Sequence, residues 1–299
     1  MPFTSAEAWR KARSFHHSRY GDDLLRVRRQ RVSVCLPARN CAATVGAIVA
    51  ALVELRERNL IDEVVVIDGD STDDTVRLAA AAGASVHRES DLIKEAGPVL
   101  GKGDAMWRSL SVLDGELICF LDADGEQFST HYLNGLLGPL IELEQVEFVK
   151  AFYRRPFRVG ELAIADGGGR VNHLLARPAL AIFYPELAGF DQPLAGEIAA
   201  RRSLLERLPF TTGYGVEIAM LLDIHAEVGL DGMAQVDLDA HSNRHQPLLA
   251  LSTMAYEILG VLAARLERDG RLSGLDPGPL LGRAAPPRSL ERPPMLARR

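Results

Sequence analysis

The sequence has 299 residues, enough for one large α/β domain with a tail or for two small domains. Apolar residues make up 47% of the chain and charged residues 25%, as in an ordinary soluble globular protein. The net charge of −6 argues against a general binder of nucleic acids or of membrane surfaces, because that binding needs an excess of positive charge.

The cysteines and the apolar segments indicate the cellular compartment of the protein. Cys35, Cys41 and Cys119 are an odd number without metal-binding spacing, and Cys35 and Cys119 lie in apolar runs typical of small core residues. The N-terminus is polar, and no apolar run nears the length that a membrane span needs. We therefore expect a cytoplasmic protein without membrane attachment.

The first 30 residues are expected to form a helix, from the amphipathic stretch SAEAWRKARSF, and a loose lead-in. Beyond them, apolar strands alternate with helices. Pro37 is expected to stop the first strand, Thr44 is a candidate N-cap of the first helix, and the second strand should stop at Asp68. The predicted strands are 31–40, 62–75, 84–89, 115–124 and 146–155, and the predicted helices are 43–55, 75–83, 101–113 and 131–143.

This alternation predicts one open, mostly parallel sheet with right-handed crossovers. The strands are near-continuous apolar runs, as expected where helices cover both faces. Polar clusters follow three of the predicted strands, at 37–40, 68–71 and 122–124. Because ligands of such sheets bind beyond the carboxyl ends of the strands, we expect the site at this edge.

The second half has a looser pattern. A glycine loop is predicted at 166–170, and helices are predicted for HLLARPALAIFYPEL, EIAARRSLLERL, 213–229 and 248–268, with a strand at 233–239. From residue 270 onward the chain is rich in Pro, Gly and Arg and is expected to be mobile or draped over the surface.

Asp122 and Asp124 end an apolar strand one residue apart. Such a carboxylate pair suits a hard divalent cation, because Mg²⁺ and Mn²⁺ prefer oxygen ligands and often bind carboxylates together with substrate phosphates. The alternative is that one aspartate caps the next turn and the other is solvated.

Eight segments occur in one order: PARN, DGDSTDDT, GKGDAMWRSL, FLDAD, VKAFYRRP, GGGRV, QPLAGE and PFTTGYGVEI. Over roughly residues 31–250 they resemble the glucosyl-3-phosphoglycerate synthases and the related mannosyl-3-phosphoglycerate synthases, which are retaining glycosyltransferases. The resemblance implies the GT-A fold, a Rossmann-like α/β fold. It also implies a nucleotide-sugar-binding half at 31–155, an acceptor-binding half at 156–268 and a tail at 269–299.

The resemblance implies roles for individual residues. Asp124, Lys102 and Glu217 would be catalytic, with Lys102 reaching the donor diphosphate or sugar. The residues implied for nucleotide-sugar binding are Pro37, Ala38, Asn40, Asp68, Ser71, Lys102, Asp122 and Ala123. Alternatives stay open: Asp68 and Asp70 would also suit a turn that caps the next helix, and Glu217 would suit the first turn of a helix.

The acceptor site is implied around the glycine loop, where backbone N–H groups and an arginine match phosphate oxygens. Its residues would be Gly168, Gly169, Arg170, Asn172, Tyr214, His241 and His245. The alternative for the loop is a flexible hairpin.

The sequence departs from the family at two places. The family usually has Asn-Glu-Glu where this chain has Asn40-Cys41-Ala42, so an acidic contact near the nucleotide base is missing. An alignment without gaps puts Asn243 where the family has a metal-binding histidine, with His241 and His245 on either side. The candidate metal ligands are therefore Asp124, Asn243, His245 and His241.

The function implied is a metal-dependent transfer, with Mg²⁺ or Mn²⁺, from UDP-glucose or GDP-mannose to the 2-hydroxyl of 3-phosphoglycerate. A homodimer is expected, with helix 248–268 as a candidate interface. A nucleotidyltransferase is one rival, although its usual glycine-rich loop does not fit PARN. A catalytically impaired sugar-nucleotide-binding protein is the other, and turnover with 3-phosphoglycerate separates all three.

Overall fold

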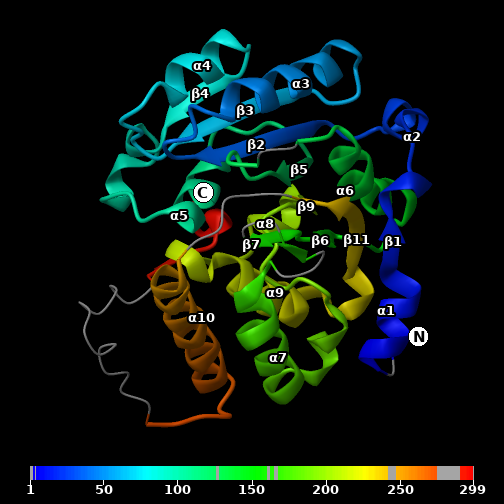
Figure 1. Ribbon diagram of the computed structural model, residues 1–299, viewed down its shortest axis with the longest axis vertical. Coiled ribbons are helices and arrows are strands. Elements are labelled where there is room, and N and C mark those ends of the chain that lie inside the picture. The colour runs from blue at the N-terminus through cyan, green and yellow to red at the C-terminus, as the bar shows by residue number, and fades with distance from the viewer. Residues whose placement is uncertain are drawn as a thin grey trace.

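An eight-stranded sheet forms the centre of the computed structural model, in the order β1-β11-β6-β9-β5-β2-β3-β4 (Figure 1). The structure describes residues 3, 5–125, 128–159, 162–164, 168–241, 247–274 and 290–298, with the backbone alone at 157–159 and 162–164. Seven strands run parallel, and only β9 (Ile198–Arg201) runs against both of its neighbours. The others are β1 (Ser14–His16), β2 (Val32–Ala38), β3 (Glu63–Asp68), β4 (Ser85–Arg88), β5 (Leu117–Phe120), β6 (Phe148–Arg154) and β11 (Met233–Ala240).

Helices cover both faces of this sheet, and each face has its own apolar core. Along β3, Val64 and Val66 belong to one core, whereas Val65 and Ile67 belong to the other, as the two-residue repeat of a strand requires. The helices are α1 (Ala6–Arg13), α2 (Asp22–Val27), α3 (Val45–Glu57), α4 (Thr75–Ala81), α5 (Lys102–Ser109), α6 (His131–Glu142), α7 (Arg177–Phe183), α8 (Arg202–Leu205), α9 (Val216–Val228) and α10 (Leu248–Arg268).

The predicted α/β class and the mostly parallel sheet are confirmed, and two local predictions are wrong. The segment EIAARRSLLERL contains strand β9 before the short helix α8. Alanine favours helices, but Ala199 and Ala200 are fully buried between β5 and β6. Pairing with the strands on both sides outweighs this preference and makes the segment extended.

Pro37 does not stop β2, which continues to Ala38. The Cys35 carbonyl accepts the Leu121 N–H on the β5 side, and the register pairs β2 with β5 only up to Cys35. Pro37 is two residues further, so its nitrogen faces the same side, beyond the last pair with β5. The missing N–H therefore costs no ladder hydrogen bond.

The C-terminal residues 290–298 are packed against the domain, so for them the expectation of a draped segment is confirmed and that of a mobile one is wrong. β12 (Glu291–Arg292) pairs with β10 (Phe210–Thr211), and Trp107 Nε1 donates to the Pro293 carbonyl at 2.8 Å. Residues 275–289 lie outside the described part of the chain.

Helix α10 is long and apolar enough to cross a membrane, by length and composition alone. Core helices of soluble proteins meet the same test. One side of α10 packs on the domain, where the buried Arg265 guanidinium forms an ion pair with Asp223 of α9 at 2.6 Å. Leu248, Leu249 and Leu259 are exposed on the same helix.

Candidate active site

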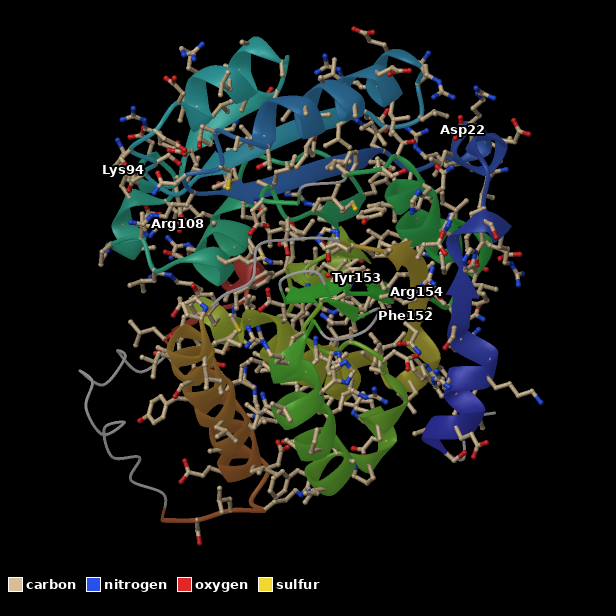
Figure 2. All side chains as sticks on the ribbon, in the orientation of Figure 1. Asp22, Lys94, Arg108, Phe152, Tyr153 and Arg154 are labelled. Carbon is tan, nitrogen blue, oxygen red and sulfur yellow. The ribbon has the colours of Figure 1, made fainter. Side chains whose placement is uncertain are left out.

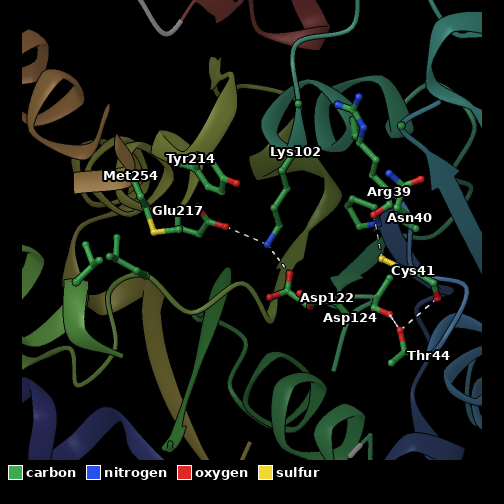
Figure 3. A pocket seen from close by; sticks show the side chains of 18 of the residues that line it. Arg39, Asn40, Cys41, Thr44, Lys102, Asp122, Asp124, Tyr214, Glu217 and Met254 are labelled. Carbon is green, nitrogen blue, oxygen red and sulfur yellow. Dashed lines mark hydrogen bonds and ion pairs between the residues drawn. The ribbon is translucent and has the colours of Figure 1, made fainter. Parts of the chain in front are cut away.

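The carboxyl ends of the parallel strands meet at one edge of the sheet, as predicted, and a cleft of about 810 Å³ opens there (Figure 3). β9 runs the opposite way, so the residues before it reach the same edge. The lining includes Pro37, Ala38, Arg39, Asn40, Cys41, Thr44, Lys102, Asp122, Ala123, Asp124, Arg155, Gly168, Gly169, Arg170, Asn172, Tyr214, Glu217, His241 and Met254.

Lys102 lies between two carboxylates at the centre of this cleft (Figure 3). Its Nζ contacts Asp122 Oδ1 and lies 3.0 Å from Glu217 Oε1. Burial lowers the pKa of Lys102, but the two carboxylates outweigh burial and hold that pKa well above its ordinary value. The lysine is therefore a fixed positive charge, and Glu217 is already paired with it.

Two glycines allow α5 to start beside the cleft. Gly101 has φ +88°, which is unfavourable for residues with a Cβ. A Cβ on Gly103 would fall 1.9 Å from the Thr211 carbonyl oxygen, so the helix packs against β10 without any side chain there. This packing sets the position of Lys102, the residue between them.

Asp122 and Asp124 differ in their environment. The pKa of Asp122 is lowered because the attraction of Lys102 overcomes the effect of burial. The pKa of Asp124 is raised by burial and by the neighbouring Asp122 charge. In the described part of the chain no other residue donates a hydrogen bond to the Asp124 carboxylate. A cation would relieve the repulsion between the two groups.

The predicted nucleotide-binding residues are divided between the cleft wall and the layer behind it. Asn40 lines the cleft, and its N–H donates to Ser71 Oγ at 2.9 Å. Ser71 N–H donates to Asp68 Oδ2 at 3.1 Å, as in the turn considered as an alternative. Asp68 and Ser71 are not among the lining residues, and Asp68 Oδ1 is buried without a hydrogen-bond partner.

Cys41, which replaces an acidic residue of the family pattern, lines the cleft. Its N–H donates to Thr75 Oγ1 at 2.8 Å, and its thiol donates to the Arg39 carbonyl. Burial raises the pKa of the Cys41 thiol, so the sulfur is uncharged. Thr44 Oγ1 donates to the Ala123 carbonyl at 2.6 Å and fixes the turn between the two aspartates.

His241 is buried at the floor of the cleft, directly after β11. The strand has a bulge between Asp237 and Ala240, which turns the following residue into the site. A Cβ on Gly125, the residue after Asp124, would lie 3.0 Å from His241 Cε1. The imidazole therefore borders the aspartate turn. Asn243 and His245 lie outside the described residues.

The hydrogen bonds of His241 leave one ring nitrogen open. Its Nδ1 lies 3.0 Å from the Tyr132 hydroxyl, which also reaches the Ala240 carbonyl at 3.3 Å. Its Nε2 is buried without a hydrogen-bond partner, 3.7 Å from Glu197 Oε1. With the proton on Nδ1, Nε2 has a lone pair for a cation. The open Nε2 and the Asp124 carboxylate fit a divalent metal ion.

The acceptor end of the cleft contains most of the residues implied for it. Gly168, Gly169 and Arg170 line it, and Gly169 has φ +66°. Asn172 has a second task, since its Oδ1 accepts the Leu194 N–H at 3.0 Å. Tyr214 is about half exposed, and its N–H donates to Glu257 at 3.0 Å.

Arg155, which belongs to the motif VKAFYRRP, lines the cleft beside the glycine loop. Arg155 donates to the Tyr153 hydroxyl at 2.8 Å, and Tyr153 donates to Glu197 Oε2 at 2.7 Å. Tyr153 and the exposed Arg154 are neighbours on β6 (Figure 2). Because side chains alternate along a strand, Tyr153 points into the domain and Arg154 points outward.

Gly196, Glu197 and Lys150 were not predicted as site residues. The Lys150 side chain is fully buried, and its Nζ donates to the Ala195 carbonyl at 2.8 Å, which holds the segment before β9. Burial lowers the pKa of Lys150 to about 8. The motifs QPLAGE and VKAFYRRP contained these residues, but the incorrect helix prediction hid the approach of Gly196 and Glu197 to the cleft.

Comparison with known proteins gives a consistent picture. Residues 33–163 match the family model described as glycosyl transferase family 2. A glucosyl-3-phosphoglycerate synthase of Petrotoga mobilis is 44% identical over 268 residues, which cover 87% of this chain and 82% of that protein. The corresponding enzyme of Mycolicibacterium smegmatis is 44% identical over 78% of this chain and 77% of its own length.

Two solved structures extend the similarity over nearly the whole fold. Mannosyl-3-phosphoglycerate synthase from Rubrobacter xylanophilus has a TM-score of 0.90 and 42% identity, with 99% of this chain and 98% of that chain covered. Glucosyl-3-phosphoglycerate synthase from Mycobacterium tuberculosis, in complex with Mn²⁺, UDP-glucose and phosphoglyceric acid, has a TM-score of 0.80 and 38% identity, with 93% and 94% covered.

Proposed function

The chain belongs to the glucosyl-3-phosphoglycerate synthase family, and we propose that it transfers glucose from UDP-glucose to the 2-hydroxyl of 3-phosphoglycerate. One observation carries the proposal most directly. Lys102, paired with two carboxylates, lines one cleft together with strand ends suited to a nucleotide and a glycine–arginine loop suited to a phosphate. The two halves of one cleft thus match a donor and an acceptor.

The donor would bind along the ends of β2 and β5. Pro37, Ala38 and Asn40 form the wall on one side, and Asp122 and Ala123 form the other. Asp68 and Ser71 would act from behind by holding Asn40. Lys102 would meet the negative charge of the diphosphate as it leaves.

The acceptor would bind at the opposite end. Gly168 and Gly169 leave their backbone close to the cleft, and Arg155 and Arg170 supply positive charge for the phosphate and the carboxylate of phosphoglycerate. Tyr214 lines the same cleft, and Glu217 pairs with Lys102. Much of the acceleration would come from holding the 2-hydroxyl close to the donor sugar.

The stereochemistry proposed is retention, as the family resemblance implies. Glu217 is held by Lys102 at 3.0 Å, which suits a role in orienting the acceptor more than an attack on the sugar. We therefore favour front-side attack, in which the acceptor hydroxyl gives its proton to the departing diphosphate.

Asp124 and His241 are the proposed protein ligands of Mg²⁺ or Mn²⁺, and Glu197 Oε1 lies 3.7 Å from the same ring nitrogen, Nε2, where its charge would favour a cation. When bound, the ion supplies positive charge for the diphosphate of the donor. In this arrangement His241, one of the candidate ligands expected from the sequence, serves the metal.

Transfer from GDP-mannose is the second candidate, because the Rubrobacter xylanophilus mannosyl enzyme is similar along nearly the whole chain. The deciding experiment is turnover with labelled UDP-glucose and GDP-mannose in competition, with Mn²⁺ and 3-phosphoglycerate. We expect the glucosyl product. A mannosyl product would favour the second candidate, hydrolysis or no turnover would favour an impaired enzyme, and release of pyrophosphate from a sugar phosphate and UTP would favour a nucleotidyltransferase.

The assembly and compartment are also proposals. A homodimer through α10 is supported by Leu248, Leu249 and Leu259, which are exposed on this helix. A reducing cytoplasm is supported by three free cysteines, two of them buried. Light scattering of wild type and Leu259→Glu would test the dimer, which the charged variant should dissociate.

A further inference from the structure

A second group of metal-binding side chains lies at the outer edge of the sheet, apart from the cleft. It consists of His16 at the end of β1, His17 directly after it, and Asp239 in β11. One possible ligand atom from each residue lies within 4.8 Å of the other two. His16 Nε2 is 3.2 Å from Asp239 Oδ1, and His17 Nε2 is 2.6 Å from Asp239 Oδ2.

The fold itself brings these three residues together. β1 pairs with β11 in parallel, so residues more than 200 positions apart reach the same end of the sheet. Asp239 lies in the bulge of β11 with φ +68°, and its N–H donates to Asp237 Oδ1 at 2.9 Å. The Asp239 carboxylate at this bulge contacts both imidazoles, that of His16 at the end of β1 and that of His17 directly after it.

The neighbours of the two histidines suit metal binding. His16 Nδ1 accepts the Ser18 N–H at 3.2 Å and also lies 2.7 Å from Ser18 Oγ, so metal binding through Nε2 would move the ring proton to Nδ1, with Ser18 Oγ in place of the N–H as its partner. The ring of His131 stacks on His17 at 4.0 Å between centroids. Both nitrogens of His131 are engaged, with Ser129 Oγ at 2.7 Å and with the Leu238 carbonyl at 3.2 Å. His131 therefore holds the His17 ring in place and leaves the metal to the other three residues.

We propose that His16, His17 and Asp239 bind a borderline transition-metal ion such as Zn²⁺, separately from the metal of the cleft. Two imidazoles and one carboxylate are a common ligand set for zinc, with water completing the tetrahedron. His16 and Asp239 are each about half exposed, so the ion has access from solvent. One positive charge opposes the binding of a cation, since Arg154 Nη2 lies 3.8 Å from Asp239 Oδ1.

The site would join the N-terminal segment to the end of β11. Asp239 precedes His241 by two residues, so a bound ion would hold the bulge that presents His241 to the cleft. The inference concerns binding alone and can therefore be tested apart from turnover.

The experiment is equilibrium dialysis of Zn²⁺ against Asp124→Ala protein, in which the proposed carboxylate ligand of the cleft is absent. We expect one bound equivalent. His16→Ala or His17→Ala on this background should each weaken binding at least about tenfold, as even changes beside metal ligands do. His87→Ala, in β4 at the opposite edge of the sheet, is the matched control and should change nothing.

Two further variants sharpen the test. Arg154→Gln removes the opposing charge and should tighten Zn²⁺ binding, which loss of folding could not do. Asp239→Asn keeps the shape of the side chain but removes its charge, so it should weaken Zn²⁺ binding. Circular dichroism should confirm that this variant is folded. If Zn²⁺ binds equally well after both histidines are replaced, or does not bind the Asp124→Ala protein at all, the proposal is wrong.

Discussion

Gly196 lies so close to Asp122 that a Cβ on the glycine would fall 2.5 Å from both carboxylate oxygens. The same Cβ would fall 2.5 Å from Lys102 Nζ. These atoms are the ends of flexible side chains, so a substitution at Gly196 would displace them and would not break the backbone. The glycine thus leaves room for the ion pair at the centre of the cleft.

Gly196→Ala is therefore expected to leave the free energy of unfolding nearly unchanged and to lower kcat by roughly a hundredfold, because small displacements of reacting groups are that costly. Steady-state kinetics and urea unfolding on the same protein separate the two effects. Gly260→Ala is the control, since a Cβ there meets nothing within 4 Å. Alanine should stabilise helix α10 by about 0.5–1 kcal/mol. Equal kinetics for the two variants would contradict this interpretation of Gly196.

The second prediction concerns the metal of the cleft. Asp124→Ala and His241→Ala should each abolish Mn²⁺ binding measured by calorimetry, and with it turnover, while Tyr132→Phe should weaken binding about tenfold through the lost support of Nδ1. Full activity of His241→Ala in saturating Mn²⁺ would return the ligand role to Asn243 or His245.

The third prediction separates donor from acceptor. Arg170→Ala and Arg155→Ala should raise the KM for 3-phosphoglycerate roughly tenfold to a hundredfold, the effect of a lost charge-assisted hydrogen bond of about 1.5–3 kcal/mol. The KM for the donor should hardly change. Arg154→Ala, next to Arg155 but directed outward, is the matched control. If glycerate without phosphate is used equally well by wild type, the loop does not bind the acceptor phosphate.

The fourth prediction follows from Glu89, a buried carboxyl in the cleft wall. Burial and the Asp104 charge raise the pKa of Glu89 to about 8 from its ordinary 4.5. The protonated form therefore stabilises the folded state fully below pH 4.5, and this contribution is lost as pH rises through about 8. Glu89→Gln cannot titrate. Its unfolding free energy relative to wild type should improve steadily across that window, and a constant difference would contradict the shift.

The edge of the sheet that holds the site was predicted correctly, because its position depends only on the order of strands and helices along the chain. Three apolar strands ending in Asn40, Asp68 and Asp122 were sufficient to locate it, since parallel strands end together. The sequence failed at β9, because alanine-rich segments favour helices and only the two neighbouring strands make this one extended. The prediction was wrong for β9 because its partner strands, β5 and β6, are distant from it in the chain.

His241, which we propose as a metal ligand, shows a second limit of prediction from sequence. Strand β11 has one extra residue between Asp237 and Ala240, which forms a bulge just before His241. His241 faces the cleft because of it. No local pattern in the sequence marks this extra residue, whose signature is the left-handed backbone of Asp239.

The last prediction concerns the C-terminal segment, whose composition suggested mobility. Arg292 donates to both carboxylate oxygens of Asp104 on α5, at 2.7 and 2.9 Å. Asp104 is completely buried, with Arg108 Nε at 3.2 Å as its other charged partner (Figure 2 labels Arg108). Arg292 also packs its guanidinium over the Trp107 ring, so the segment closes the side of α5 away from the cleft.

Arg292→Ala would leave the buried Asp104 carboxylate short of one partner and should lower the free energy of unfolding by about 3 kcal/mol, as breaking a buried pair does. Arg77→Ala breaks an exposed pair with Asp74 on α4 and should leave the free energy of unfolding nearly unchanged. Because Asp104 is two residues from Lys102, the first variant should also lower kcat, whereas the second should not. Urea unfolding and steady-state kinetics of both variants test this prediction. If Arg292→Ala is as stable as Arg77→Ala, the C-terminal segment does not contribute to holding α5.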